Sequence, residues 1–141
     1  MMDAIIAEEG VSRIEYICPA GARTIGVGHN IDVHGLPEWA VPPLTDEMLQ
    51  RLLEEDIRRA ESDARTLIDD WDSLPQAVRD ILVHMSFQLG RTRLRGFRKF
   101  LAAVARHDWA AAADEMMDSK WAREDSPARA QRLVRMMRGQ T

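Results

Sequence analysis

Residues 15–29 read EYICPAGARTIGVGH, and this stretch decides the small β part of the fold. Apolar and polar side chains alternate in IEYI and again in TIGVGH, with Pro-Ala-Gly-Ala between the two runs. Alternation with a period of two is typical of strands, and proline and glycine between two such runs predict a turn. We therefore expect a β-hairpin, with Cys18 where its turn begins and Thr24 on its second strand.

The segments on either side of the hairpin have different patterns. Residues 2–9 place apolar side chains at helical spacing, and Gly10 follows as a natural end of that short helix. Residues 30–43 contain three prolines and a glycine, a composition that predicts a loop or a short third strand.

Helical periodicity dominates the rest of the chain. It predicts a long helix at about 45–69, a core helix that ends at Gly90, a helix over 96–105, and two further helices that begin near 108 and 127. Thr45, Asp108 and Ser126 stand where N-terminal caps are expected. The fold class is therefore α+β and mainly α. A single domain, 1–141, would contain a small lobe at about 10–56 and a helical lobe formed by 1–9 and 70–141, with a ligand site in the cleft between them.

Composition excludes several classes of protein. The 141-residue chain has one cysteine, so it holds no internal disulfide framework. It lacks a run of about 20 apolar residues, which argues against membrane insertion. Its start, MMDAIIAEEG, has acids where a signal peptide has basic residues.

The charge is distributed unevenly along the chain. Residues 1–90 hold 17 acids and 7 Lys/Arg (net −10), whereas residues 91–141 hold 6 and 12 (net +6). The basic half could meet an anionic polymer, or it could pair with the acidic half of the same chain. No basic stripe interleaved with aromatic residues is present, so no nucleic-acid partner is expected.

Glu9, Cys18 and Thr24 are the candidate chemical groups near the hairpin. The helix end, the strands and the turn could bring the three side chains together. A helix C-terminus carries a partial negative charge that disfavours an ionised carboxyl, and a protonated carboxyl can serve as the general acid in glycosidic bond cleavage. Spacing alone does not show whether Glu9 has this role or is an ordinary solvated glutamate. It also does not show whether Cys18 takes part in chemistry or is a small buried packing residue.

The segment AEEGVSRIEYICPAGARTIGVGHNI resembles the active-site region of the phage-type lysozymes, or endolysins, of glycoside hydrolase family 24. Glu9, Cys18 and Thr24 fit the family arrangement E-x8-D/C-x5-T. Further segments resemble the helical lobe of the family in order and spacing: DSLPQAVRDILVHMSFQLG, GFRKFL, DWAAAADEMMDSKW and SPARAQRLVRMMRG. The resemblance thus covers nearly the whole chain and implies a lysozyme-like fold.

The resemblance also implies roles for individual residues. Glu9 would protonate the oxygen between N-acetylmuramic acid and N-acetylglucosamine, and Thr24 would hold the attacking water or contact the sugar. Arg129 would pair with Glu9, and His29 with Asp56 would tie the hairpin to the long helix. Other positions match those that contact substrate or line the cleft: Phe87, Gln88, Asn30, Glu115 and the region of Trp121. No cofactor or metal is implied.

Several positions depart from the T-even phage pattern. Cys18 stands where that pattern has aspartate, while Asn30, Phe100 and Glu115 replace leucine, serine and asparagine. Cys18 has three open interpretations: a thiolate nucleophile with retention at the anomeric carbon, a water-positioning group with inversion, or a dispensable residue. We favour the nucleophile, because cysteine recurs at this position in the family pattern. Activity should then rise with pH as the thiolate forms, until Glu9 loses its proton.

The resemblance predicts a muramidase that causes cell-wall lysis, acts on bacterial peptidoglycan as a monomer, and stays in the host cytoplasm until a separate holin-like pore releases it. Two alternatives belong to the same fold, namely a catalytically inactive peptidoglycan-binding homologue and a lytic transglycosylase. A third is a helical interaction protein whose eight methionines form an adaptable surface, although this leaves the hairpin unexplained.

Overall fold

The computed structural model describes residues 2–140, so the two end residues of the expected 1–141 domain lie outside the described part. The chain forms two compact units, residues 1–58 and 59–141, and the boundary falls inside a helix. The sequence prediction assigned residues 1–9 to the helical lobe, but their contacts group them with the hairpin.

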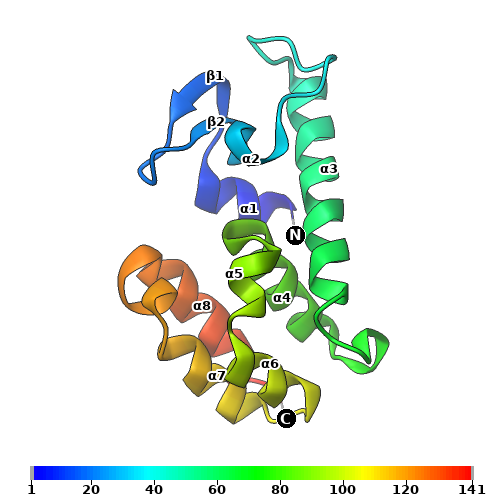
Figure 1. Cartoon of the computed structure of the whole chain (residues 1–141), viewed down its shortest axis with the longest axis vertical. Coiled ribbons are helices and arrows are strands. Elements are labelled where there is room, and N and C mark those ends of the chain that lie inside the picture. Colours follow the sequence, from blue (N-terminus) through cyan, green and yellow to red (C-terminus); the bar gives the residue numbers. More distant parts are fainter. Residues whose placement is uncertain (1, 141) are drawn as a thin grey trace. The chain divides into compact units, whose positions relative to one another are not determined.

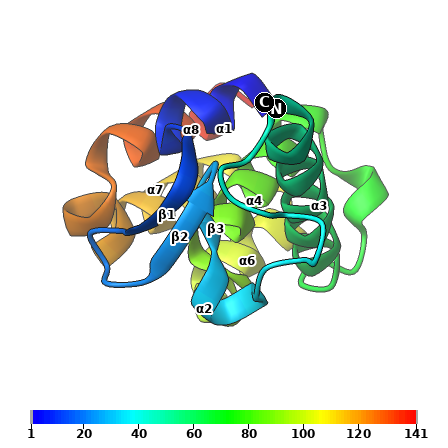
Figure 2. The ribbon, with the colours of Figure 1, turned by 90° about the horizontal axis from the view of Figure 1, so that it is seen from above.

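The first unit combines a three-stranded sheet with helices. Its elements are α1 (Met2–Glu9), β1 (Ser12–Ile17), β2 (Arg23–Gly26), β3 (His29–Asn30), α2 (Ile31–His34) and the first part of α3 (Asp46–Arg65). The antiparallel sheet has the order β1-β2-β3, and α2 follows directly from β3 (Figures 1 and 2). The predicted hairpin is therefore confirmed. A short third strand is present, but it overlaps the range 30–43 only at Asn30, and residues 31–34 form a helix where a loop or strand was predicted.

The β1–β2 pairing is regular only near the turn. Tyr16 lies opposite Thr24 and Ile17 opposite Arg23, but the register shifts before Ser12 pairs with Gly26. Such a bulge bends and twists a strand. β1 is exposed along most of its length, so hydrogen bonds rather than burial hold it in place.

The core of the first unit lies beneath β2 and beside α3. Buried apolar side chains from β2, α2, the loop and α3 form it: Ile25, Ile31, Ala40, Leu44 and Leu52, with Trp39, Met48 and Leu49 packed against them. Burying a large aliphatic side chain contributes about 1.5–3 kcal/mol. This cluster anchors β2 and leaves β1 at the edge.

Helix α3 begins as predicted and ends earlier. The Thr45 hydroxyl accepts a hydrogen bond from the Met48 amide at 3.2 Å, which confirms the cap. The helix ends at Arg65 instead of near 69, because the amides of residues 67 and 68 bond to carbonyl oxygens three residues back. Ile68 is nevertheless buried, so the apolar periodicity continued past the end of the helix.

The second unit is helical throughout its described part. Its elements are a 3-10 turn (Trp71–Ser73), α4 (Gln76–Leu89), α5 (Arg91–Arg95), α6 (Arg98–Ala105), α7 (Trp109–Met117), a π-helical turn (Trp121–Asp125) and α8 (Pro127–Arg138). Helix α8 packs against α7 and α4, and α6 packs against α7. The largest side chains buried among them are Ile81, Leu82, Met85, Leu94, Phe100, Met116, Trp121 and Met137.

Two details of the helical unit differ from the sequence prediction. A separate helix, α5, precedes the predicted helix over 96–105, which begins at Arg98. Ser126 precedes α8, but its hydroxyl accepts a hydrogen bond from the Gln88 side chain and makes no capping bond. Asp108 does cap α7, since its carboxylate accepts from the Ala111 amide at 3.1 Å. Among the described residues, the structure contains no helix with the length and apolar character needed to cross a membrane.

Candidate active site

Glu9 is the last residue of α1, and its side chain lies against the β2–β3 turn. Gly10 ends the helix in the left-handed region, with φ of +73°, and its amide bonds to the Ile6 carbonyl oxygen at 2.9 Å. A Cβ atom at Gly28 would lie 2.9 Å from Glu9 Oε2, closer than a real contact allows. The absence of a side chain at Gly28 is therefore what lets the carboxyl group rest on this turn.

Cys18 lies at the mouth of the hairpin turn. Its amide donates to the Ala22 carbonyl oxygen at 3.0 Å, and its own carbonyl oxygen accepts from the Gly21 amide at 2.8 Å. Pro19 presets the backbone at the next position, and Gly21 takes a positive φ of +88°. These bonds close the chain tightly around the thiol.

The closed turn favours the ionised form of Cys18. Burial raises the pKa of the thiol, but the polar groups around it, first the Ala22 backbone, then the Thr24 side chain and the backbones of Ala20 and Gly21, outweigh that effect and hold the pKa below its usual value. The thiolate is the nucleophilic form of cysteine. The local backbone is thus arranged to stabilise the reactive form of this side chain.

Thr24 and Tyr16 face each other across the two strands near the thiol. Thr24 is buried, and its hydroxyl donates to the Ala22 carbonyl oxygen at 3.0 Å. The pKa of Tyr16 is raised, first by burial and then by the negative charges of Glu9 and Cys18. The Tyr16 phenol therefore lies within electrostatic range of both Glu9 and Cys18.

His29 and Asp56 form the buried pair that the resemblance predicts. Nδ1 of His29 lies 2.8 Å from Asp56 Oδ2, and Nε2 lies 2.7 Å from the Gly35 carbonyl oxygen. The Gly35 carbonyl oxygen can only accept, so Nε2 donates to it, and Nδ1 shares a hydrogen bond with the Asp56 carboxyl group. The pair connects β3 to α3 and fixes the end of the small sheet.

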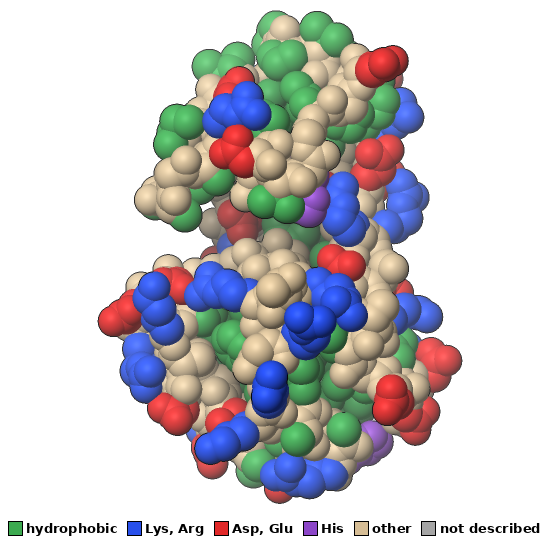
Figure 3. Space-filling model, in the orientation of Figure 1, with side chains coloured by type: hydrophobic (Ala, Val, Ile, Leu, Met, Phe, Trp, Pro, Cys, Tyr) green, Lys and Arg blue, Asp and Glu red, His purple; other side chains and the backbone are tan. Residues whose placement is uncertain are grey.

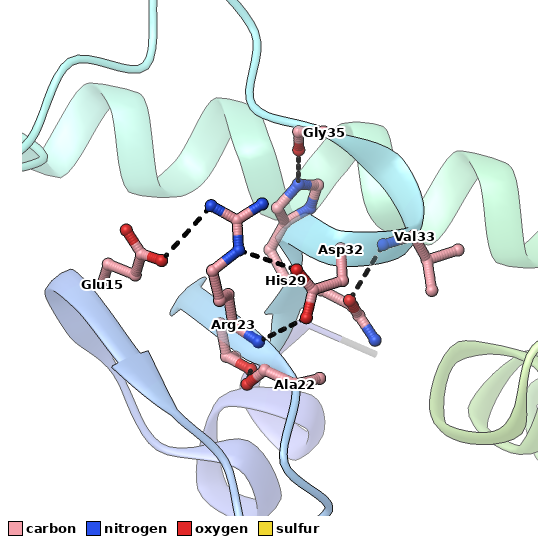
Figure 4. Close-up of polar contacts among 9 residues, drawn as sticks. Glu15, Ala22, Arg23, His29, Asp32, Val33 and Gly35 are labelled. Carbon is pink, nitrogen blue, oxygen red and sulfur yellow. Dashed lines mark hydrogen bonds and ion pairs between the residues drawn. The ribbon is translucent and has the colours of Figure 1, made fainter.

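Asn30 and Asp32 act at the start of α2. Oδ1 of Asn30 accepts from the Val33 amide at 3.0 Å and caps this helix. The Asp32 carboxylate binds Arg23 through both the backbone and the side chain, and Glu15 lies on the other side of the same guanidinium (Figure 4). The sequence analysis missed Arg23 and Asp32, because nothing in their spacing indicates that β2 and α2 meet there. Sugar contact by Asn30 stays a prediction.

In the second unit, Gln88 and Trp121 belong to one hydrogen-bond network. The Trp121 indole donates to Gln88 Oε1 at 2.8 Å, and the Gln88 amide nitrogen donates to the Ser126 hydroxyl. Trp121 is fully buried, so its indole ring packs in the core instead of contacting a sugar. Phe100 is 1% exposed and packs edge-on to Phe97, so it makes no contact with a sugar in this conformation.

Arg129 is buried on α8 and lies near His84 of α4. Burial and then the Arg129 charge lower the pKa of His84. The histidine is another residue that the sequence analysis missed. Phe87 and Glu115 are half-buried on α4 and α7. The proposed pairing of Arg129 with Glu9, and substrate contact by Phe87, Gln88 or Glu115, stay predictions.

The two units differ in charge. Residues 1–58 hold 11 acids and 4 Lys/Arg, whereas residues 59–141 hold 12 acids and 15 Lys/Arg. Figure 3 shows Lys and Arg side chains spread over the second unit on the face drawn. Across residues 2–140, no group of three or more His, Cys, Asp or Glu side chains is placed to hold a metal ion.

Comparison with known proteins agrees with this geometry. The sequence model of the family "Phage lysozyme" matches residues 7–138, from α1 to the end of α8. The chain belongs to this family. It is also 26% identical over 155 aligned positions to "Probable T4-type lysozyme 2" of Dictyostelium discoideum, an alignment that covers 95% of this chain and 91% of that protein. Family membership confirms the lysozyme-like α+β fold and, in general terms, a glycosidase that cleaves peptidoglycan.

Proposed function

We propose that the protein hydrolyses the β-1,4 bond between N-acetylmuramic acid and N-acetylglucosamine in bacterial peptidoglycan, with Glu9 and Cys18 as catalytic residues. The observation that supports this proposal is the hydrogen-bonded turn at Cys18, where the pKa of the thiol is lowered, in the same unit as the Glu9 carboxyl group on the β2–β3 turn. Most glycosidases use two such groups, one that donates a proton and one that is anionic.

The proposed reaction has two displacements at the anomeric carbon of the muramic acid residue. The Cys18 thiolate attacks the anomeric carbon, and the bond between that carbon and the bridging oxygen breaks. At the same time, Glu9 gives its proton to the bridging oxygen. Water then attacks the same carbon and displaces the thiolate, while the Glu9 carboxylate takes the proton of the water. Two inversions give net retention. Thr24 contacts the thiol and would orient it or the incoming water.

Experiments on isolated peptidoglycan test the proposal through its products. The wild-type protein should release new reducing ends, whereas the matched Glu9→Gln variant should lose about 10²- to 10⁴-fold in rate. Cys18→Ser, which keeps the shape but has no readily ionised group, should also be strongly impaired. The first anomer formed by the wild type, observed by NMR before mutarotation, should be the retained β form.

Other outcomes would replace the proposal. An inverted product would make Cys18 a water-positioning group, and full activity of Cys18→Ser would make it dispensable. An anhydro sugar in place of a reducing end would identify a transglycosylase. The protein would be an inactive peptidoglycan-binding homologue if the wild type cleaved nothing and if the wild type and Glu9→Gln sedimented equally with the wall.

The wider role that we propose is that of an endolysin. Cleavage of the wall glycan would lyse the cell after a separate holin-like pore released the protein from the host cytoplasm. The excess of Lys and Arg in residues 59–141 supports encounter with anionic wall polymers, because charge of opposite sign speeds association. Lysis only on co-expression with such a pore, with no lysis by Glu9→Gln, would support this role.

A further inference from the structure

We propose that Asp32 is a positioning residue for the Cys18 turn and acts through the peptide bond that joins Ala22 to Arg23. The inference deepens the proposed function, on which its catalytic meaning rests. Its geometry, however, depends only on contacts within residues 1–58.

The Asp32 carboxylate holds one residue at two points. Its Oδ2 accepts from the Arg23 backbone amide at 2.9 Å, and its Oδ1 accepts from Arg23 Nε at 2.7 Å (Figure 4). Hydrogen bonds to an ionised acceptor are stronger than neutral ones. Because one carboxylate restrains both the backbone and the side chain, the first residue of β2 is fixed relative to α2.

The restrained amide belongs to the peptide group whose carbonyl oxygen is bonded to the Cys18 backbone amide. The Ala22 carbonyl oxygen, on the opposite side of that planar group, accepts from the Cys18 amide and from the Thr24 hydroxyl, each at 3.0 Å. Turning this plane would alter all three bonds together. Asp32 thus sets the orientation of the group around which Cys18 and Thr24 are arranged, and consecutive hydrogen bonds of this kind polarise one another.

The same contacts contribute little to folding. The side chains of Arg23 and Asp32 are 52% and 45% exposed, and exposed ion pairs contribute little net stability. Glu15 provides a matched comparison, since it is 46% exposed and lies 3.7 Å from Nη1 of the same guanidinium. Glu15 and Asp32 both pair with the Arg23 guanidinium, but it is Asp32 that accepts the hydrogen bond from the Arg23 backbone amide.

The positioning residue stays charged while the thiol titrates. Hydrogen bonds from the Arg23 side chain and then from its backbone amide hold the pKa of Asp32 below the usual value. A carboxylate with a depressed pKa is ionised throughout the neutral and alkaline range where a thiol ionises. A change in the pH profile of Cys18 reactivity therefore does not come from titration of Asp32; Tyr16, whose pKa is raised partly by the Cys18 charge, is the neighbouring group that also titrates at high pH.

The test is the rate at which iodoacetamide alkylates Cys18 as a function of pH. Cys18 is the only cysteine in the chain, so the signal has one source. Asp32→Ala should alkylate about three- to tenfold more slowly at pH 7, with the profile displaced to higher pH, because fewer thiols are ionised. Glu15→Gln should stay within about twofold of the wild type. Asp32→Asn should be intermediate, since its amide oxygen still accepts from Arg23.

Three results would overturn the proposal. Asp32→Ala could have the same alkylation rate as Glu15→Gln. It could also be alkylated faster than the wild type, because loss of the Asp32 charge would leave the Arg23 cation to stabilise the thiolate. If Asp32→Ala fails to fold by circular dichroism, an Asp32→Asn profile identical to that of the wild type would be equally decisive. Alkylation needs no substrate, so its result does not depend on the proposed function. Full activity of Cys18→Ser would refute the catalytic role of Cys18 but would not change the effect of Asp32 on thiol reactivity. If both proposals hold, Asp32→Ala lowers kcat and leaves KM unchanged.

Discussion

The hairpin of residues 12–26 and helix α4 are held in place by different physical effects. Strand β1 is exposed along most of its length, and the turn after it is closed by backbone hydrogen bonds around Cys18. Helix α4 instead buries most of one face, including Ile81, Leu82 and Met85, which are fully buried. Individual polar contacts therefore determine the positions of the candidate catalytic groups in the first unit, whereas packing determines the stability of the second unit. Substitutions should therefore affect mainly activity in the hairpin and mainly stability in the helices.

The largest expected effect is loss of packing at Trp121. Trp121→Ala should lower the free energy of unfolding by about 3–5 kcal/mol, because it leaves a large cavity in the second unit and removes a hydrogen bond to Gln88. Urea unfolding followed by circular dichroism measures this change. Trp121→Phe keeps most of the bulk and should cost clearly less. Equal losses in the two variants would mean that the hydrogen bond matters more than packing.

The next effect tests a buried polar contact of the first unit. Asp56→Ala should cost about 3 kcal/mol, since it leaves Nδ1 of the buried His29 ring without its carboxyl partner. Asp46→Ala is the matched control, because Asp46 pairs with Arg13 at an exposed site and should cost less than about 1 kcal/mol. Similar values for both variants in urea unfolding would show that the buried pair is not a special support of the sheet.

The sequence predicted those parts of the fold in which neighbours along the chain determine the structure. Alternation gave the hairpin, periodicity gave α4 and α8, and Thr45 and Asp108 were recognised as caps. The Ser126 cap was wrong because a residue distant in sequence, Gln88, takes its hydroxyl. Local patterns carry no information about such a partner.

The candidate site shows the same division. Motif resemblance identified Glu9, Cys18 and Thr24, and the structure places all three in the first unit. It could not identify Asp32 or Gly28, because their importance comes from two segments meeting in space. Charge partners and close backbone approaches are properties of the fold, so they were visible only once β2, β3 and α2 had been placed.

A smaller change tests the close approach of Glu9 to the backbone. Gly28→Ala should cost about 1–2 kcal/mol, because φ is +71°, and it should also reduce peptidoglycan cleavage, because the new Cβ displaces the Glu9 carboxyl. Gly35→Ala is the control, since Gly35 has a φ of +72° but no other atom within 4 Å of the added Cβ. Both variants should lose stability in urea unfolding, because each forces a side chain into a positive φ, but Gly28→Ala alone should lose activity. Equal activity in both would separate Glu9 from catalysis.

The smallest expected effect compares one identical substitution in the two regions. Ile17→Val in β1 removes a methylene from a side chain that is 63% exposed, so it should change stability by less than about 0.5 kcal/mol. Ile81→Val in α4 makes the same chemical change at a fully buried side chain and should cost about 0.5–1.5 kcal/mol. Both residues are branched at Cβ, so backbone propensity changes little in either variant. Equal costs would mean that Ile17 is covered in solution, and the contrast between a hydrogen-bonded hairpin and a packed helix would then fail at its most exposed strand.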